Sequence, residues 1–447
     1  MTRRALILSA VFGLLSCTAV VAPADAATGL SPAHGFAPHQ VIVKFDGEAR
    51  GRALPLPPGV GVREAATALR GNPRVAYAEP NYIATASEAP FLGIPNDPGV
   101  LDAIPSSTAG GWVSKQWNFL PWEGEGNDET PTSSGGIDAV GAWRRLAEAG
   151  RPGAQGVKVA VLDTGIAYRS KGKRFRRSPD FTAGQFVKGY DFVANDRLPM
   201  DENGHGTHVA GTIGEKTNNG IALTGLAYRA GLMPVRVLDR YGSGQADDIA
   251  RGIRYAVDHG ADVINMSFNF GCHKRVPVIN EELRRANRMG VVTVASIGNL
   301  GAESCVAPPA TGPGVIGVGG TTEGGCLGAY SLSGKGVDVV APGGGTPAPG
   351  CPSVLTGPIY QVTLKGGNPS VFAEPADYVG TSMAAAHVSG VAAMILASGV
   401  LPPKLKGAKL VGAVTARLEG TARSIGLPRT EQGAGLIDAA RATDPSD

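Results

Sequence analysis

Residues 380–390 read Gly380-Thr381-Ser382-Met383-Ala384-Ala385-Ala386-His387-Val388-Ser389-Gly390, and the rest of the chain is organised around them. The pattern predicts a short loop that runs into an apolar helix, with Ser382 in the first turn. A hydroxyl there lies near unpaired backbone N–H groups and the positive end of the helix dipole. That position suits a nucleophile whose attack builds negative charge. Serine is also a common N-cap of a buried helix, so the rest of the chain has to decide.

The composition indicates one large domain with appendages. The chain has 447 residues, of which 43% are hydrophobic and 18% charged, enough for a sizeable core. Its 65 glycines follow no collagen-like period and are typical of an α/β protein with many tight turns. The formal net charge of +3 is too small to indicate a nucleic-acid partner.

The N-terminus has the pattern of a secretory signal peptide. Arg3 and Arg4 precede an apolar run over residues 5–15, which is too short to span a bilayer. Ala24-Asp25-Ala26 is a small-residue cleavage site, so residues 1–26 are predicted to be removed and the protein to be extracellular or periplasmic. The alternative is a lipoprotein anchored at Cys17, because Leu14-Leu15-Ser16-Cys17 resembles a lipoprotein signal box.

The cysteines fit export. Cleavage after Ala26 leaves four of the five cysteines, and an even number in an exported chain predicts two disulfides. Order along the chain favours Cys272–Cys305 and Cys326–Cys351, although three connectivities can be drawn. No CxxC spacing indicates zinc.

A small segment follows the signal. Residues 41–45 alternate like a strand, residues 65–69 suggest a helix, and residues 75–82 suggest a second strand. Such a unit is too small to be very stable alone. The next stretch, residues 84–111, is rich in Pro, Ser, Gly and Ala and is expected to be an exposed linker.

From Gln116 onward, short β-branched runs alternate with amphipathic helices. This alternation predicts an α/β domain whose parallel sheet carries helices on both faces. The helices are expected over residues 247–259 and 280–289. The strands are expected over residues 157–162, 231–238, 261–267, 291–296, 315–319 and 337–340.

Polar residues with catalytic potential stand at the ends of these elements. Asp163 directly follows the first strand of the domain, and ligands of such sheets bind beyond the carboxyl ends of strands. His205 lies between Gly204 and Gly206 at the start of an apolar helix, where the glycines permit close approach. The plainer interpretations are an Asx-turn for Asp163 and a structural role for His205. A metal site on His205 and His208 lacks the HExxH pattern.

The order Asp163, His205, Ser382 is that of subtilisin, and no G-x-S-x-G elbow is present. The flanking blocks Val161-Leu162-Asp163-Thr164-Gly165-Ile166, Gly204-His205-Gly206-Thr207-His208-Val209-Ala210-Gly211 and Gly380-Thr381-Ser382-Met383-Ala384-Ala385 closely resemble the three signatures of the subtilisin-like serine proteases. The resemblance covers nearly the whole chain. It implies an α/β, subtilisin-like three-layer fold with a mostly parallel central sheet, preceded by a small α+β propeptide. The implied boundaries are residues 1–26 for the signal, 27–90 for the propeptide and 91–447 for the catalytic domain.

The resemblance also implies residue roles in a secreted serine endopeptidase that is made as a self-processing zymogen. Ser382 would attack the peptide carbonyl to form an acyl-enzyme, His205 would carry the proton, and Asp163 would orient His205. Asn299, in Ile297-Gly298-Asn299, resembles the family's oxyanion-hole asparagine. The segments that resemble substrate-binding strands are Gly242-Ser243-Gly244 and Ser267-Phe268-Asn269. The expected partners are protein or peptide substrates and the propeptide, and a monomer is expected.

The sequence differs from the usual family pattern at two places, and the resemblance also implies a metal site. Ala386 stands where the family usually has proline, and Phe268-Asn269-Phe270 replaces Leu-Gly-Gly beside the primary specificity pocket. The resemblance implies structural calcium bound by Asp180, Asn219 and the carbonyls of Thr217, Ile221 and Leu223. Ordinary turn residues are the alternative for this set.

An insertion over residues 169–177 carries six basic side chains, among them Lys171, Lys173, Arg174, Arg176 and Arg177. A solvated loop is the favoured interpretation, and an exosite for acidic partners is the second.

Two rival functions remain on the sequence alone. The chain could be a non-catalytic relative that serves as a binding module, although such a module needs neither the triad nor Asn299. It could also be a metal-dependent hydrolase built on His205 and His208.

Overall fold

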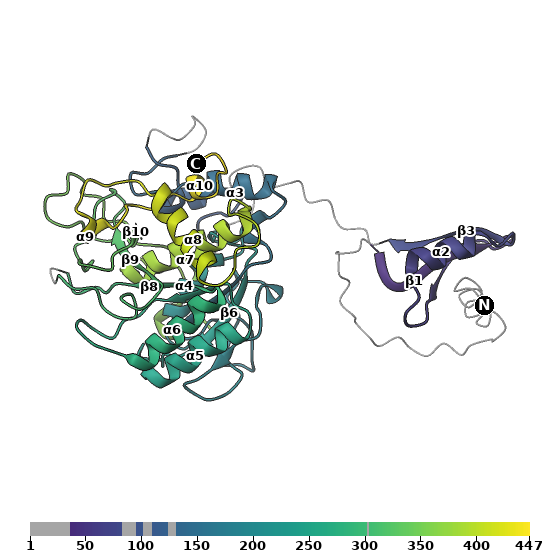
Figure 1. Ribbon diagram of the computed structural model, residues 1–447, viewed down its shortest axis with the longest axis horizontal. Helices are drawn as coiled ribbons and strands as arrows, with labels where there is room; N and C mark the ends of the chain where they lie inside the picture. The colour runs from purple at the N-terminus through teal and green to yellow at the C-terminus, as the bar shows by residue number, and fades with distance from the viewer. Residues whose placement is uncertain (1–35, 83–94, 102–109, 124–130, 302–303) are drawn as a thin grey trace. The chain divides into compact units, whose positions relative to one another are not determined.

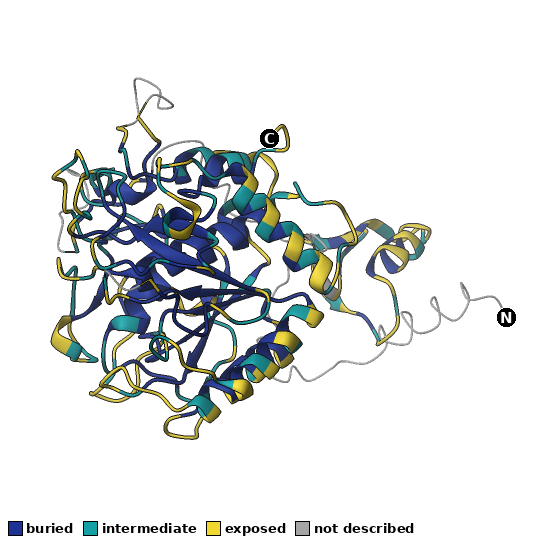
Figure 2. Ribbon diagram, turned by 60° about the vertical axis from the view of Figure 1, so that its left-hand side comes forward, coloured by how far each residue is buried: buried dark blue, intermediate teal, exposed yellow. Residues whose placement is uncertain are grey.

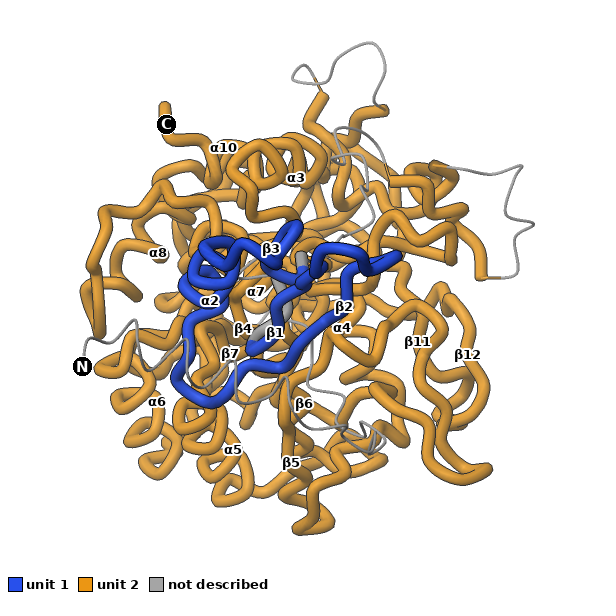
Figure 3. Tube along the Cα trace, turned by 90° about the vertical axis from the view of Figure 1, so that its right-hand side faces the viewer, with its two compact units in different colours: residues 1–89 blue, residues 90–447 orange. Residues whose placement is uncertain are grey.

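The computed structural model describes residues 36–82, 95–101, 110–123, 131–301 and 304–447 (Figure 1). The predicted signal peptide with Cys17, and most of the predicted linker over residues 84–111, lie outside the described residues. The chain divides into two compact units, Met1–Ala89 and Pro90–Asp447, which Figure 3 colours separately.

The first unit is a three-stranded antiparallel sheet with one helix. Its strands are β1 (Phe36–Phe45), β2 (Arg52–Pro55) and β3 (Val75–Tyr82), in the order β2-β1-β3. The helix α2 (Val62–Arg70) buries Val62, Ala65, Ala66 and Leu69, in one core with Val41, Val43, Leu56 and Ala78. The sequence predicted α2 and β3 but not β2, whose four residues lie mostly in solvent and therefore show no apolar pattern.

The second unit is built on a seven-stranded sheet in which every pair of neighbouring strands is parallel. The strand order is β10-β9-β8-β7-β4-β6-β5. The strands are β4 (Lys158–Asp163), β5 (Tyr190–Asp191), β6 (Gly231–Arg236), β7 (Val263–Met266), β8 (Val292–Ser296), β9 (Val315–Thr321) and β10 (Val339–Pro342). The central strands are buried on both faces, as parallel sheets require.

Helices cover this sheet and complete a three-layer α/β fold (Figures 1 and 2). The helices α5 and α6 pack together and against β4, β6 and β8, whereas α4 and α7 pack together and against β4 and β7 to β10. The helices of this unit are α3 (Ala139–Glu148), α4 (His205–Gly214), α5 (Ala246–Asp258), α6 (Pro277–Met289), α7 (Thr381–Ser398), α8 (Ala408–Thr421), α9 (Arg429–Gln432) and α10 (Ala439–Ala442). Short 3₁₀ turns lie at Gly111–Ser114, Trp117–Phe119, Pro152–Ala154, Ala183–Gln185 and Lys365–Gly367.

The helix α7 is the central element of the core. It begins after Gly380 and ends before Gly399, whose φ of 84° is the left-handed conformation that often terminates helices. Among the described helices, α7 has the length and hydropathy that could cross a membrane, but 89% of that stretch is buried inside the protein. Its apolar character is therefore that of a core helix.

A hairpin that the sequence did not predict lies between β10 and α7 along the chain. Its strands β11 (Thr363–Leu364) and β12 (Phe372–Ala373) pair antiparallel, and the backbone N–H of Arg176 donates to the carbonyl of Pro369 in its turn at 2.9 Å. The hairpin thus contacts the basic insertion over residues 169–177.

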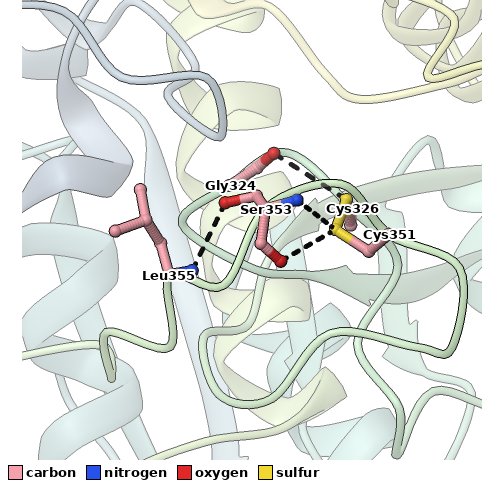
Figure 4. Close-up of a disulfide and its surroundings, with 5 residues drawn as sticks. All are labelled: Gly324, Cys326, Cys351, Ser353 and Leu355. Atoms are coloured by element: carbon pink, nitrogen blue, oxygen red, sulfur yellow. Dashed lines mark hydrogen bonds between the residues drawn. A yellow bond between two sulfur atoms is a disulfide. The ribbon is translucent and has the colours of Figure 1, made fainter.

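Two disulfides connect loops of this unit. Cys272 is bonded to Cys305, and Cys326 is bonded to Cys351. Around the second bond, the Ser353 N–H donates to Cys351 Sγ at 3.3 Å and the Leu355 N–H donates to Ser353 Oγ at 3.3 Å (Figure 4).

Candidate active site

The carboxyl edge of the parallel sheet gathers the polar residues that the sequence singled out. Asp163 is the last residue of β4, Ser267 directly follows β7, and Asn299 follows β8 by three residues. Because β8, β7 and β4 are consecutive neighbours in one parallel sheet, their carboxyl ends meet at the same edge.

His205 is held against Asp163. The ring Nδ1 of His205 donates to Asp163 Oδ1 at 2.8 Å, and the side chain of His205 keeps 26% of its surface exposed. Burial lowers the pKa of His205, but the charge of Asp163 and its hydrogen bond raise it more, so the net pKa lies above the ordinary value of 6.5. Nε2 therefore remains as the proton-accepting atom of an imidazole that is more basic than usual.

Glycines on both sides of His205 permit this geometry. Gly204 has a backbone φ of 111°, which residues with a side chain rarely adopt. A Cβ at Gly206 would lie 2.2 Å from the carbonyl oxygen of Gly165. The helix α4 can begin at His205 only because neither position carries a side chain.

Asp201 fixes the loop that leads into α4, and sequence reasoning missed it. Its Oδ1 accepts from the backbone of Asn203 at 2.8 Å and of Gly204 at 3.0 Å, and its Oδ2 accepts from Thr207 Oγ1 at 2.6 Å. Its side chain is buried, and burial raises its pKa despite these hydrogen bonds. The available signal was an Asp-x-Asn-Gly turn directly before the helix.

Ser382 lies in the first turn of α7, as predicted. Its hydroxyl donates to the carbonyl oxygen of Ser267 at 3.1 Å. In this structure the hydroxyl is thus directed to the end of β7, the strand next to the one that carries Asp163. No hydrogen bond joins Ser382 and His205 in the part of the chain that the structure describes.

Asn299 is anchored beside the nucleophile. Its Oδ1 accepts from the Thr381 N–H at 2.9 Å and from Thr381 Oγ1 at 2.8 Å. Because both bonds go to the side-chain oxygen of Asn299, its Nδ2–H₂ group points away from Thr381 and is available to donate to another acceptor. An amide donor is therefore presented one residue from Ser382.

The two predicted substrate-binding segments differ in exposure. Residues 242–244 are exposed, and the N–H of Ser243 donates to Asp239 Oδ1 at 3.0 Å. Ser267 is buried, whereas Phe268 is half-buried and Asn269 exposed. The rings of Phe268 and Phe270 meet edge to face with centroids 6.3 Å apart, so both aromatic side chains fill space beside the end of β7.

Part of the predicted calcium set is assembled around Asp180. Asp180 Oδ1 accepts from Asn219 Nδ2 at 2.9 Å, and Oδ2 accepts from the Leu223 N–H at 3.0 Å. Burial raises the pKa of Asp180 well above its ordinary value, and the charges of Asp97 and Glu374 raise it further. Thr217 and Ile221 lie in the same loop.

Asp97 is the residue of this cluster that sequence reasoning missed. It is fully buried, and its two oxygens accept from the backbone of Asn218 at 2.8 Å and Asn219 at 3.0 Å. Burial raises its pKa to about 6, although these backbone N–H groups lower it. The described residues hold no group of three or more His, Cys, Asp or Glu side chains suited to a metal, so any cation here would also need amide and carbonyl oxygens.

His208 does not share a site with His205. Its Nε2–H donates to the carbonyl of Ile359 at 2.9 Å, and its ring stacks on Tyr378 at 4.0 Å. Burial lowers the pKa of His208 to about 3. The ring is a neutral structural histidine, which removes the basis for a metal-dependent hydrolase built on this pair.

The comparisons with known proteins agree with the resemblance. A model described as the subtilase family matches residues 154–435. A thermophilic serine proteinase of Bacillus sp. (strain AK1) is 36% identical over 338 residues, which are 76% of this chain and 67% of that protein. Thermitase of Thermoactinomyces vulgaris is 34% identical over 306 residues, or 68% of this chain and 93% of that protein.

A solved structure of proteases from Pseudoalteromonas arctica PAMC 21717 superposes with a TM-score of 0.60 at 29% identity, covering 78% of this chain and 98% of that one. The family match, the relatives and the solved structure therefore agree with one another. The chain belongs to the subtilase family and is a serine endopeptidase.

Proposed function

We propose that this endopeptidase hydrolyses peptide bonds through Asp163, His205 and Ser382, with Asn299 as an oxyanion donor. The observation that carries the proposal is the 2.8 Å bond from His205 Nδ1 to Asp163 Oδ1 at the carboxyl edge of the sheet. Ser382, in the first turn of α7, donates to the carbonyl of Ser267 at the end of the neighbouring strand β7. The bond fixes the imidazole in the tautomer that leaves Nε2 free to take a proton.

The reaction follows from these positions. Ser382 Oγ turns from the Ser267 carbonyl towards His205 Nε2, gives up its proton and attacks the scissile carbonyl. Asn299 Nδ2 and the Ser382 N–H donate to the oxyanion. His205 then protonates the leaving amine, and a water molecule activated in the same way releases the acid from the acyl-enzyme.

The substrate is proposed to lie extended between residues 242–244 and residues 267–269. Phe268 and Phe270 add side chains where the primary pocket is expected, so we infer a preference for small or medium residues before the scissile bond. A difference of one methylene in such a pocket is worth ~1–3 kcal/mol. A peptide-library profile dominated by Trp, Tyr or Phe there would show that this pocket is not narrowed.

The zymogen arrangement is a further part of the proposal. Residues 1–26 would direct export and be removed, residues 27–90 would act as a propeptide, and residues 91–447 would form the mature, monomeric enzyme. The A-x-A site at Ala24-Asp25-Ala26 and the separate core of the first unit support this division. Membrane anchoring at Cys17 is the alternative, and mass spectrometry of the mature N-terminus separates the two.

Calcium is proposed to bind at Asp97, Asp180 and Asn219, with carbonyls of residues 217, 221 and 223. The donors fit, because buried carboxylate and amide oxygens are the hard ligands that calcium prefers. Among the described residues, no Lys or Arg pairs with either carboxylate, so a bound cation would neutralise their mutual repulsion.

A fluorophosphonate probe tests the central claim. It should label the mature protein at Ser382 in a peptide map, and Ser382→Ala should abolish labelling and peptide hydrolysis while the secreted chain keeps its fold. Near-wild-type hydrolysis by Ser382→Ala would refute the assignment. An unlabelled wild-type protein without hydrolytic activity would favour a binding module.

A further inference from the structure

A polar hollow of about 640 Å³ is lined in part by the loop that leads to His205. Its walls come from four separate segments: Arg174 in the basic insertion, Glu202 and Asn203 just before His205, Arg240 before the edge segment, and residues 366–370 in the β11–β12 turn. We call it the insertion pocket, because the basic insertion and the unpredicted hairpin supply two of its walls.

The acidic residue of the insertion pocket is already neutralised. The guanidinium of Arg236 contacts Glu202 Oε2 at 3.3 Å and Asp191 Oδ2 at 2.9 Å. Arg174 forms a short ion pair with Glu202 Oε1. The negative charges of Glu202 and Asp191 are thus neutralised by the positive charges of Arg174 and Arg236. Glu202 therefore presents no uncompensated negative charge to the pocket.

Arg240 is the uncompensated charge of the pocket. Its side chain is exposed and lies over the ring of Tyr241 at 5.1 Å, and no carboxylate pairs with it in the described part of the chain. Its backbone is held in place, because Asn203 Nδ2 donates to the Arg240 carbonyl at 3.0 Å. The nearby Asp239 carboxylate accepts instead from the backbone of Tyr241 at 2.8 Å and Ser243 at 3.0 Å.

The location indicates which part of a substrate reaches this pocket. Side chains of an extended peptide alternate between opposite sides. If the residue before the scissile bond faces the segment 267–269, the side chain of the residue before that one points away from this segment. Glu202 and Asn203 lie three and two residues before His205 in the sequence, and Arg240 lies two residues before the edge segment at residues 242–244.

We propose that the insertion pocket binds an aspartate or glutamate side chain at the second residue before the scissile bond. Arg240 is its main ligand, and Arg174, shared with Glu202, is the second. The planar guanidinium matches a carboxylate with two parallel hydrogen bonds. A lysine or arginine of a substrate would instead meet the field of Arg240 and would have to displace Arg174 or Arg236 from Glu202.

This inference rests on the proposed function, and the test separates the two. Two quenched peptides differ only in Asp or Asn at that position, so they share shape and differ in charge. The wild-type enzyme should favour the Asp peptide in kcat/KM by about tenfold, the size of one charge-assisted hydrogen bond. The preference should shrink in 0.5 M NaCl, because salt screens an exposed pair.

Variants assign the preference to the pocket. Arg240→Gln should bring the Asp/Asn ratio close to one, and Arg240→Glu should invert it. Arg284→Glu makes the same charge change on α6, at an exposed position outside the pocket, and should keep the wild-type ratio. Because the ratio is internal to each enzyme, a change in overall activity does not affect it.

Each other outcome is decisive. Equal cleavage of both peptides by the wild type, or a ratio that Arg240→Glu leaves unchanged, would overturn the pocket and leave the proposed function intact. Cleavage of neither peptide, nor of any library peptide, would overturn the proposed function itself.

Discussion

Ser267 and Ser382 exchange two hydrogen bonds. Ser382 Oγ donates to the Ser267 carbonyl at 3.1 Å, and Ser267 Oγ donates to the Ser382 carbonyl at 2.8 Å. The pair ties the first turn of α7 to the carboxyl end of β7. Asn265 Nδ2 in turn donates to Ser267 Oγ at 2.9 Å, so the position of the nucleophile is linked to the interior of the sheet.

Replacing Ser267 by alanine should therefore destabilise the protein and loosen Ser382. Ser267→Ala leaves the buried Asn265 amide without its acceptor and the Ser382 carbonyl without its side-chain donor, a cost of ~1–3 kcal/mol. Urea unfolding measures the loss. Ser114→Ala removes a hydroxyl from an exposed position and should change the free energy of unfolding by less than ~0.5 kcal/mol. Equal effects of the two substitutions would show that the reciprocal pair does not contribute to stability.

The pH dependence of catalysis should report the Asp163–His205 pair. His205 must be neutral to accept a proton, so kcat/KM should rise with pH through a midpoint above 6.5, the side to which Asp163 moves its pKa. In Asp163→Asn the charge is lost, and the midpoint should fall by roughly one to three pH units.

Asp262→Asn changes a partly buried carboxyl that accepts from the Lys158 backbone, away from the histidine. Its midpoint should match that of the wild type. A midpoint that stays in place in Asp163→Asn would mean that His205 is not the titrating group.

The sequence predicted the central sheet because its strands are apolar on both faces. The runs that became β4, β6, β7, β8 and β9 appear in the structure within one or two residues of their predicted ends. The sequence did not predict the shortest strands: β2 and β5 are edge strands of four and two residues, and the β11–β12 hairpin pairs over only two residues on each side.

The missed site residues share a physical reason. Asp97 is a loop carboxylate whose backbone partners lie more than 120 residues away, and no local pattern records such a contact. Arg174 and Arg240 line one pocket only because the basic insertion and the loop after β6, which are far apart in the sequence, fold together there. By contrast, Asp163 ends β4, His205 begins α4 and Ser382 lies in the first turn of α7, so the local sequence identified them.

Calcium should stabilise the enzyme through Asp97. A ligand at ~100 times its Kd contributes about 2.7 kcal/mol to the free energy of unfolding, so Tm should rise when calcium replaces a chelator. Asp97→Asn removes one charge from the shell, and the calcium-dependent rise in Tm should largely disappear.

Asp338 supplies the matched control. It is also a carboxyl whose pKa burial raises to about 6, but it accepts from the Gly317 N–H, far along the sheet from the Asp180 loop. Asp338→Asn should keep the full calcium-dependent rise in Tm. Identical responses to calcium in both variants would argue against a site at Asp97.

The last prediction concerns the first unit as a folding partner. Its core holds eight buried side chains, three of them alanine, so it buries little apolar surface of its own. The parallel sheet of the second unit must pair strands that lie far apart in sequence, such as β4 with β7, before the central helix α7 can pack on them. Such non-local pairing is slow, and a bound template would lower its barrier.

A protein that begins at Pro95 should therefore refold poorly alone. Adding residues 27–90 in trans should restore folding and then inhibit the folded enzyme. Leu69→Ala in that segment removes a buried core side chain at a cost of ~2–5 kcal/mol and should abolish the rescue. Glu64→Gln, exposed on the same helix, should preserve it. If the shortened protein recovers full activity unaided, or if Leu69→Ala rescues as well as the native segment, the first unit does not act as a folding template.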